Sequence, residues 1–129
     1  MDIVVDFDGT CVTHEYPEIG REIGATAVLR ELADAGHRLI LFTIRSNDKK
    51  RKNHTLDDAV DWFRQRSIPL YGIQSHPEQQ FWTSSPKAYG EMYIDDAALG
   101  CPLIIPQIDN RPYVDWKTVR KLLEERNLL

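Results

Sequence analysis

The N-terminal segment MDIVVDFDGT (residues 1–10) decides the fold, because an apolar run there ends abruptly at an aspartate. The run from Met1 to Val5 is typical of a strand buried on both faces, as in a parallel sheet. Asp6 and Asp8 follow it directly. Open α/β sheets bind ligands beyond the carboxyl ends of their strands, so both carboxylates lie where a site is expected.

The rest of the chain alternates between strand-like and helix-like patterns. Short apolar runs predict further strands over residues 39–43, 70–73, 92–94 and 103–105. Helical spacing of apolar residues predicts helices over 25–35 and 56–65, and after Asp115. Thr55 and Asp115 are expected to cap their helices, and Gly36 to end the first. The alternation predicts a single α/β domain over residues 1–129, with a doubly wound, mainly parallel five-stranded sheet.

The composition limits the classes of protein to which this chain can belong. A chain of 129 residues with 42% hydrophobic residues can build one core, and its formal charge of −4 lacks the basic footprint of nucleic-acid binders. Cys11 and Cys101 form no CxxC pair, which favours reduced thiols in a cytoplasm. No apolar run approaches the roughly 18 residues of a membrane span. We expect a cytoplasmic protein with no membrane partner.

Polar residues follow several of the expected strands. Asp6 and Asp8 end the first strand, Thr43 ends the second, and Asp95 and Asp96 end the fourth. A single Asp after a strand is usually a turn former, but several on one edge repel one another and need a counter-cation. Oxygen ligands of this kind suit Mg²⁺.

Four segments resemble the signatures of the haloacid dehalogenase (HAD) superfamily in order and spacing. VVDFDGT (residues 4–10) resembles the first, and Thr43 at the end of LILFT the second. Lys87 in SSPKAYG resembles the third, although Lys49, Lys50 or Lys52 could reach the same edge. Asp95 and Asp96 in MYIDD resemble the fourth.

The resemblance implies a Mg²⁺-dependent phosphatase that works through an aspartyl phosphate on Asp6. Asp8 would be the general acid and base. The implied metal ligands are Asp6, the main-chain carbonyl of Asp8, and Asp95, with Asp96 either a ligand or an anchor behind them. The implied phosphate-binding residues are Thr43 and Lys87, with Gly9 and Thr10 forming the turn beside the phosphate.

The sequence leaves the roles of several other residues near the expected site open. Arg45 could bind a second phosphate or a carboxylate of the substrate, or it could be a surface arginine. The run Lys49 to Lys52 is most simply a solvated loop, with a polyanion contact as the alternative. The sequence gives no geometry with which to choose among His14, His76 and Trp82. Cys11 is expected to be a small buried hydrophobe.

The intervals that hold cap domains in HAD relatives are short here, so the chain resembles a capless member. An open site suits a phosphate on a macromolecule, nucleic acid included, or a small molecule covered by a neighbouring subunit in a homo-oligomer. The acidic composition slightly favours a small phosphorylated substrate. Two alternative functions remain: a regulatory protein that binds phosphate or a partner without turnover, and a phosphotransferase. A receiver-like signalling module is disfavoured, because its acidic pair and acceptor aspartate occur in another order.

Overall fold

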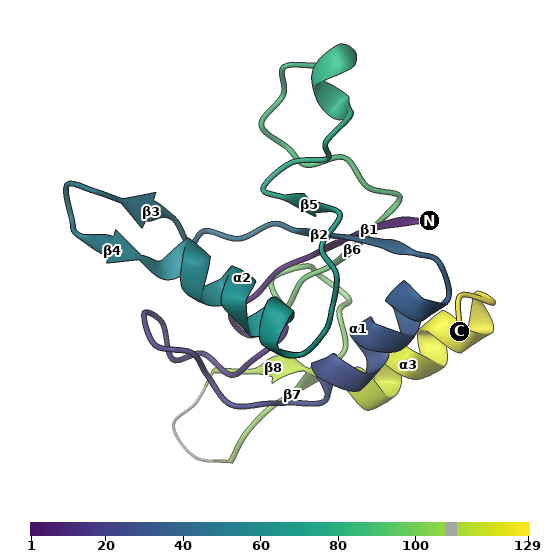
Figure 1. Cartoon of the computed structure of the whole chain (residues 1–129). Coiled ribbons are helices and arrows are strands. Elements are labelled where there is room, and N and C mark those ends of the chain that lie inside the picture. The colour runs from purple at the N-terminus through teal and green to yellow at the C-terminus, as the bar shows by residue number, and fades with distance from the viewer. Residues whose placement is uncertain (108–110) are drawn as a thin grey trace.

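The computed structural model describes residues 1–107 and 111–129, and its centre is a parallel sheet of four strands (Figure 1). The strands lie in the order β5-β2-β1-β6, and their bounds are β1 Asp2–Val5, β2 Arg38–Leu41, β5 Gly72–Ile73 and β6 Met92–Ile94. The helices are α1 Ala25–Asp34, α2 Thr55–Gln65 and α3 Trp116–Glu125. The α/β class predicted from the sequence is confirmed. In the described part of the chain, no helix is both long enough and apolar enough to cross a membrane.

All three helices cover one face of the sheet. Side chains alternate along a strand, and Ile3 and Val5 of β1 belong to a core that also contains buried residues of α1, α2 and α3. Val4 points to the other face, where it packs with Ile40 and Ala88. The doubly wound arrangement predicted from the sequence is therefore confirmed only in part, because no α-helix among the described residues covers the second face.

The segment between β5 and β6 takes the place of that missing helix. The chain must pass from one side of β2 to the far side of β1, and right-handed crossovers in this direction run over the second face. Residues 74–91 make this passage with one short 3₁₀ helix, η1 Gln79–Phe81. The sequence predicts only a surface loop here, because the two prolines break any helical period.

The buried side chain of Gln79 organises this segment from within. Its amide oxygen accepts hydrogen bonds from the main-chain N–H groups of His76 and Tyr89, both at 2.9 Å. Its amide nitrogen donates to the carbonyls of Ser85 and Lys87. One side chain thus replaces the backbone hydrogen bonds that a helix would have supplied.

The expected fifth strand lies outside the main sheet. Leu103–Ile104 forms β7, which pairs antiparallel with β8 Tyr113–Val114 in a separate two-stranded sheet. The third expected strand is shorter than residues 70–73, since only Gly72–Ile73 pairs with β2. The prediction of a five-stranded sheet is wrong, because apolar runs identify strands but not their partners.

Two helix starts differ in their capping. Asp115 caps α3 as predicted, accepting from the N–H groups of Lys117 and Thr118. Thr55 does not cap α2: it is the first helical residue, and its hydroxyl donates to the carbonyl of Ser46. This hydrogen bond ties α2 to a hairpin, β3 Asn47–Asp48 and β4 Asn53–His54, whose turn is the basic run Lys49 to Lys52.

Candidate active site

The carboxyl ends of β1 and β6 bring three acidic side chains together. Val5 is in register with Ile94, and the Asp6 N–H donates to the Ile94 carbonyl at 3.1 Å. Asp6 therefore lies beside the Asp95–Asp96 pair that follows β6. One carboxylate oxygen from each of Asp6, Asp95 and Asp96 can be chosen so that all lie within 4.8 Å of one another. Residues nearly 90 positions apart thus form one oxygen-rich cluster.

Thr10 links the two sides of this cluster. Its hydroxyl is 2.8 Å from Asp6 Oδ2 and 3.2 Å from Asp96 Oδ1, and it accepts a hydrogen bond from the Asp96 N–H at 3.0 Å. The single hydroxyl proton can serve only one carboxylate at a time. Thr10 is fully buried, and its carbonyl accepts from the indole N–H of Trp116 at 2.7 Å, so α3 supports the cluster from below.

His14 is a site residue that the sequence does not single out. Its Nε2 lies 2.9 Å from Asp96 Oδ2, and both side chains are largely buried. Such a contact fixes the orientation of a carboxylate, as partners behind metal ligands commonly do. No sequence motif predicts this role for His14, because its contact with Asp96 depends on the path of the loop after Thr10.

Gly9 makes the close approach of these groups possible. Its φ is +81°, a left-handed conformation that favours glycine. A Cβ atom on this residue would lie 2.0 Å from His14 Nε2 and 2.5 Å from Asp96 Oδ2. The sequence predicts the turn at Gly9, and the structure adds that a side chain there would displace the His14–Asp96 contact.

No lysine or arginine among the described residues forms an ion pair with Asp6, Asp95 or Asp96. Burial raises the pKa of Asp6 to about 8, against an opposing hydrogen bond from Thr10, and the neighbouring Asp95 and Asp96 raise it further. Burial also raises the pKa of Asp95, and Asp96 adds to that rise. An oxygen-only donor set with surplus negative charge fits a hard divalent cation such as Mg²⁺.

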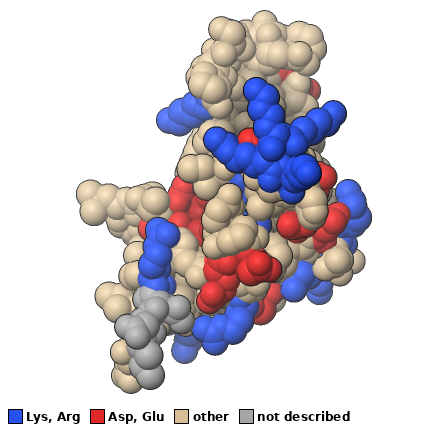
Figure 2. Space-filling model, turned by 90° about the vertical axis from the view of Figure 1, so that its left-hand side faces the viewer, with Lys and Arg blue, Asp and Glu red and all other residues tan. Residues whose placement is uncertain are grey.

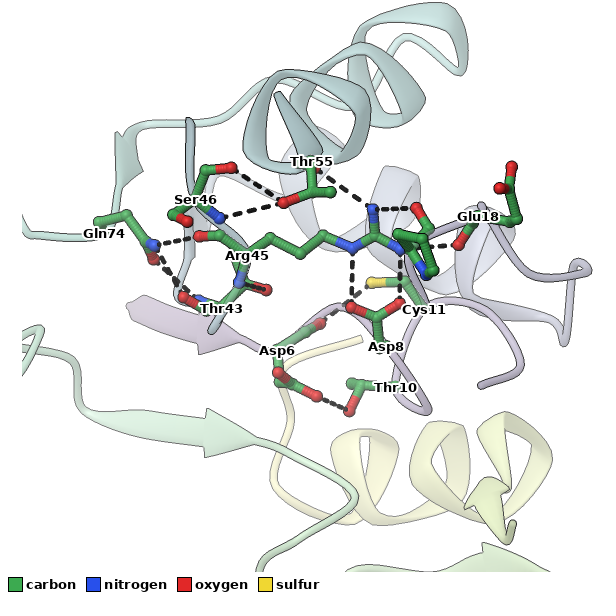
Figure 3. A network of polar contacts seen from close by, with 11 residues as sticks. Asp6, Asp8, Thr10, Cys11, Glu18, Thr43, Arg45, Ser46, Thr55 and Gln74 are labelled. Carbon is green, nitrogen blue, oxygen red and sulfur yellow. Dashed lines mark hydrogen bonds and ion pairs between the residues drawn. The ribbon is translucent and has the colours of Figure 1, made fainter. Parts of the chain in front are cut away.

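Asp8 points away from the cluster toward Arg45, as Figure 3 shows. Arg45 Nε and Nη2 donate to the two Asp8 carboxylate oxygens, both at 2.8 Å. The remaining N–H groups reach the carbonyls of Pro17, Glu18 and Thr55, so all five donors of the guanidinium are used. Arg45 is completely buried. The sequence predicts that Arg45 is either a substrate ligand or a surface arginine. Both predictions are wrong, because the loop of residues 17–18 and α2 cover Arg45 completely.

Thr43 lies at the end of β2, where the sequence places it. Its hydroxyl accepts from the Arg45 N–H at 3.1 Å, and no protein acceptor for the hydroxyl proton lies within residues 1–107 and 111–129. Its main-chain N–H and carbonyl bind the side-chain amide of Gln74 at 2.8 and 2.7 Å. Gln74 is a second residue that the sequence misses, and it fixes the position of Thr43.

Lys87 lies on the second face of the sheet. Its ammonium is 5.6 Å from the centre of the Tyr93 ring, and it forms no ion pair with the described acidic residues. Tyr93 belongs to β6 and comes two residues before Asp95, so Lys87 lies over the strand that leads to the cluster. Lys49, Lys50 and Lys52 lie around the exposed hairpin turn. The prediction that Lys87 binds phosphate remains a prediction.

One solved structure is similar over nearly the whole chain. It is that of a conserved protein from Bacteroides thetaiotaomicron, with a TM-score of 0.75 and 35% sequence identity, covering 98% of this chain and 91% of that one. The chain belongs to the family of this conserved protein. This relationship establishes the family but assigns no activity to it. The reaction must therefore be argued from the chemistry of the site. No protein-family profile matches the chain, and no curated protein does.

Proposed function

We propose that the protein is a Mg²⁺-dependent phosphomonoester hydrolase of the HAD superfamily that works through an aspartyl phosphate on Asp6. The observation that carries the proposal is the cluster of Asp6, Asp95 and Asp96 oxygens within 4.8 Å at the carboxyl ends of β1 and β6. The DxDGT order of residues 6–10 supports the same assignment. The small size of both possible cap insertions fits a capless member.

Asp6, Asp95 and Asp96 would hold the cation, together with the main-chain carbonyl of Asp8. When bound, Mg²⁺ would offset the charge of the carboxylates and of an anionic substrate. Burial raises the pKa of Asp6, and the neighbouring Asp95 and Asp96 raise it further. A bound cation would offset both effects.

Asp6 is the proposed nucleophile. Thr10 is hydrogen-bonded to Asp6 Oδ2 and holds the side chain in one orientation, which leaves the other oxygen available to attack phosphorus. Attack in line with the ester bond would give an aspartyl phosphate and release the alcohol. Water would then hydrolyse this acyl phosphate and restore Asp6. The Thr43 hydroxyl and the Lys87 ammonium are the proposed donors to phosphoryl oxygens.

Asp8 is the proposed base for the water step. Both of its oxygens accept from Arg45, but each carboxylate oxygen has a second lone pair, so Asp8 can still accept a proton from water. Donating a proton to the leaving alcohol is a different task. It requires Asp8 to carry a proton on one of the lone pairs that Arg45 leaves free.

The Arg45–Asp8 contact also favours a second candidate, a phosphate-binding protein of the same fold without turnover. If the ion pair with Arg45 kept Asp8 from acting as acid or base, the site could bind a phosphate together with Mg²⁺ and release the phosphate unchanged. The two candidates share the cluster and differ only in what Asp8 does.

The test is hydrolysis of an aryl phosphate by the wild type, Asp6→Asn and Asp8→Asn, each with Mg²⁺ and with a chelator. We expect Mg²⁺-dependent turnover by the wild type and none by Asp6→Asn. Asp61→Asn, on the exposed side of α2, is the matched control and should keep full activity.

Beryllofluoride, which mimics an aspartyl phosphate, separates the two candidates if the wild type does not turn over. Mg²⁺-dependent binding by the wild type and none by Asp6→Asn would favour the binding protein. Failure of the wild type to bind either Mg²⁺ or beryllofluoride would rule out both candidates.

A further inference from the structure

The side chain of Gln74 is bound to the segment after β2 by three hydrogen bonds, the Gln74 clamp. Its amide oxygen accepts from the Thr43 N–H at 2.8 Å. Its amide nitrogen donates to the Thr43 carbonyl at 2.7 Å and to the Arg45 carbonyl at 3.1 Å. The main chain of Gln74 is itself held by β2, since its N–H donates to the Leu41 carbonyl at 2.7 Å. One side chain thus satisfies three main-chain groups beyond the end of the strand.

The backbone of Gln74 has an unfavourable conformation. Its φ is +65°, in the left-handed region that residues with a Cβ atom rarely adopt. Such conformations persist where surrounding contacts hold them, and they are concentrated at functional sites. Glycine adopts this φ readily but has no amide with which to bind residues 43 and 45. The position therefore carries an unfavourable backbone together with a side chain that is fully engaged at the end of β2.

Thr43, the residue that the clamp holds, lies beside the proposed nucleophile. Leu41 is in register with Val5, and the Phe42 N–H donates to the Val5 carbonyl at 3.0 Å. Thr43 and Asp6 therefore follow paired residues at the same edge of two adjacent strands, whose spacing is about 4.8 Å. The clamp acts directly on a neighbour of the acidic cluster.

The Thr43 hydroxyl is left as a hydrogen-bond donor. It accepts from the Arg45 N–H at 3.1 Å, and no protein group in residues 1–107 and 111–129 accepts its proton. The clamp fixes the peptide groups on both sides of the Thr43 Cα atom. A donor held in this way needs no reorganisation when charge develops on a phosphoryl oxygen.

The clamped segment also leads to Asp8 and to the basic hairpin. Figure 3 shows Gln74, Thr43, Arg45 and Asp8 joined by successive contacts. The β3–β4 hairpin begins two residues beyond Arg45, and Figure 2 shows Lys and Arg side chains gathered where this hairpin faces the viewer. A positive field of this kind raises the local concentration of anions. Fixing residues 43–45 therefore also fixes the base of the hairpin.

We infer that Gln74 is a positioning residue, which holds the Thr43 hydroxyl where it donates to a phosphoryl oxygen in the transition state. The inference rests on the proposed function. Gln74 does not itself serve as a donor to the substrate, because both of its amide protons are bound by the carbonyls of Thr43 and Arg45. Its effect on the rate must therefore pass through Thr43.

The first experiment measures hydrolysis of an aryl phosphate by Gln74→Gly, Thr43→Val and the double variant, all with Mg²⁺. Glycine suits the φ of this position, so the variant removes the clamp without adding backbone strain. We expect kcat to fall by roughly 10–100-fold in Gln74→Gly with KM nearly unchanged, because a misplaced donor weakens the transition state more than substrate binding. In the Thr43→Val background, removing the clamp should have almost no further effect on kcat.

Two glutamine-to-glutamate variants separate positioning from a general loss of structure. Gln74→Glu keeps the length of the side chain and the acceptor for the Thr43 N–H, but an ionised carboxylate cannot donate to the two carbonyls. It should lose activity as Gln74→Gly does. Gln80→Glu is the matched control, because Gln80 is exposed and its amide reaches the Pro77 carbonyl only at 3.4 Å. This control should keep full activity.

The second experiment tests the clamp without turnover. Calorimetric titration should give Gln74→Gly the Mg²⁺ affinity of the wild type, because the clamp binds residues 43 and 45 and none of the three carboxylates. Beryllofluoride should bind more weakly to Gln74→Gly and Thr43→Val, and no more weakly to the double variant than to Thr43→Val. This pattern would support positioning even in a protein that binds without turnover, which would overturn only the hydrolase.

The opposite results are equally specific. Losses of kcat that multiply in the double variant, or wild-type activity in Gln74→Gly, would overturn the inference and leave the hydrolase intact. Failure of the wild type to bind Mg²⁺ or beryllofluoride would remove the proposed function and the inference with it.

Discussion

Arg45 holds both carboxylate oxygens of Asp8, each at 2.8 Å, from a completely buried position. The same guanidinium also binds two other parts of the chain, through the carbonyls of Pro17 and Glu18 and through that of Thr55. It therefore connects the DxD segment to the loop that covers it and to the start of α2.

Replacing Arg45 by Met should destabilise the protein by roughly 3–5 kcal/mol, because the Asp8 charge would be left buried and unpaired. Urea unfolding at pH 7 measures the loss. Arg51→Gln is the control, since its exposed pair with Asp48 contributes at most about 1 kcal/mol. Adding Asp8→Leu to Arg45→Met should recover part of the loss, and simple additivity of the two changes would contradict the pairing.

Gly9→Ala should cost more stability than Gly36→Ala, although both glycines have a positive φ. A Cβ on Gly36 meets nothing within 4 Å, so that variant reports backbone strain alone, about 1–2 kcal/mol. A Cβ on Gly9 must also displace His14 and Asp96. Thermal unfolding with and without Mg²⁺ gives the comparison. Equal losses, with the Mg²⁺-dependent stabilisation retained in Gly9→Ala, would show that the crowding has no effect.

His14→Phe should weaken Mg²⁺ binding by about tenfold or more, because Asp96 would lose the partner that orients it. Calorimetric titration with Mg²⁺ measures the affinity directly. His54→Phe is a suitable control, since His54 pairs with Asp58 on the exposed surface of α2. Unchanged Mg²⁺ affinity in His14→Phe would place His14 outside the metal site.

Asp6→Asn should stabilise the protein in the presence of a chelator. The folded protein raises the pKa of Asp6 to about 8, so it binds a proton that the unfolded chain has lost. Wild-type stability must then fall as the pH rises from about 4 to about 8. The advantage of the variant should grow across this window to on the order of 1 kcal/mol or more and shrink when Mg²⁺ is added. Equal unfolding midpoints at pH 9 in chelator would contradict the charge imbalance.

Asp2 should contribute to acid unfolding at the opposite end of β1. Hydrogen bonds from Arg38 lower the pKa of Asp2 despite its burial, and His76 lies 2.9 Å from the same carboxylate. Because the pKa of Asp2 is lower in the folded protein, its ion pair stabilises the fold at pH values above the ordinary pKa near 3.8. This stabilisation is lost as the pH falls through the pKa of Asp2 in the folded protein. Asp2→Asn should therefore be less stable than the wild type at pH 7, and the difference should vanish once the pH falls below the lowered pKa of Asp2 in the folded protein. A difference that persists unchanged into acid would assign the loss to packing.

Local patterns in the sequence determined much of the fold. The apolar runs ending at Asp6, Thr43 and Asp95 identify three of the four strands of the sheet, β1, β2 and β6, and their carboxyl ends. Parallel strands must end at the same edge, so the cluster of Asp6, Asp95 and Asp96 could be predicted before any geometry was known. The Asp115 cap and the turn at Gly9 also follow from local chemistry, because each depends on residues close together in the chain.

The tertiary structure decided which groups meet across long separations. It turns Asp8 toward Arg45, brings His14 back to Asp96 and pairs Thr43 with Gln74, and none of these contacts has a local signal. It also places β7 outside the main sheet and covers the second face with a segment organised by Gln79. A side chain's partner depends on how loops close over the sheet, whereas a strand or cap depends on its immediate neighbours. The sequence by itself therefore located the acidic site, and the fold decided what surrounds it.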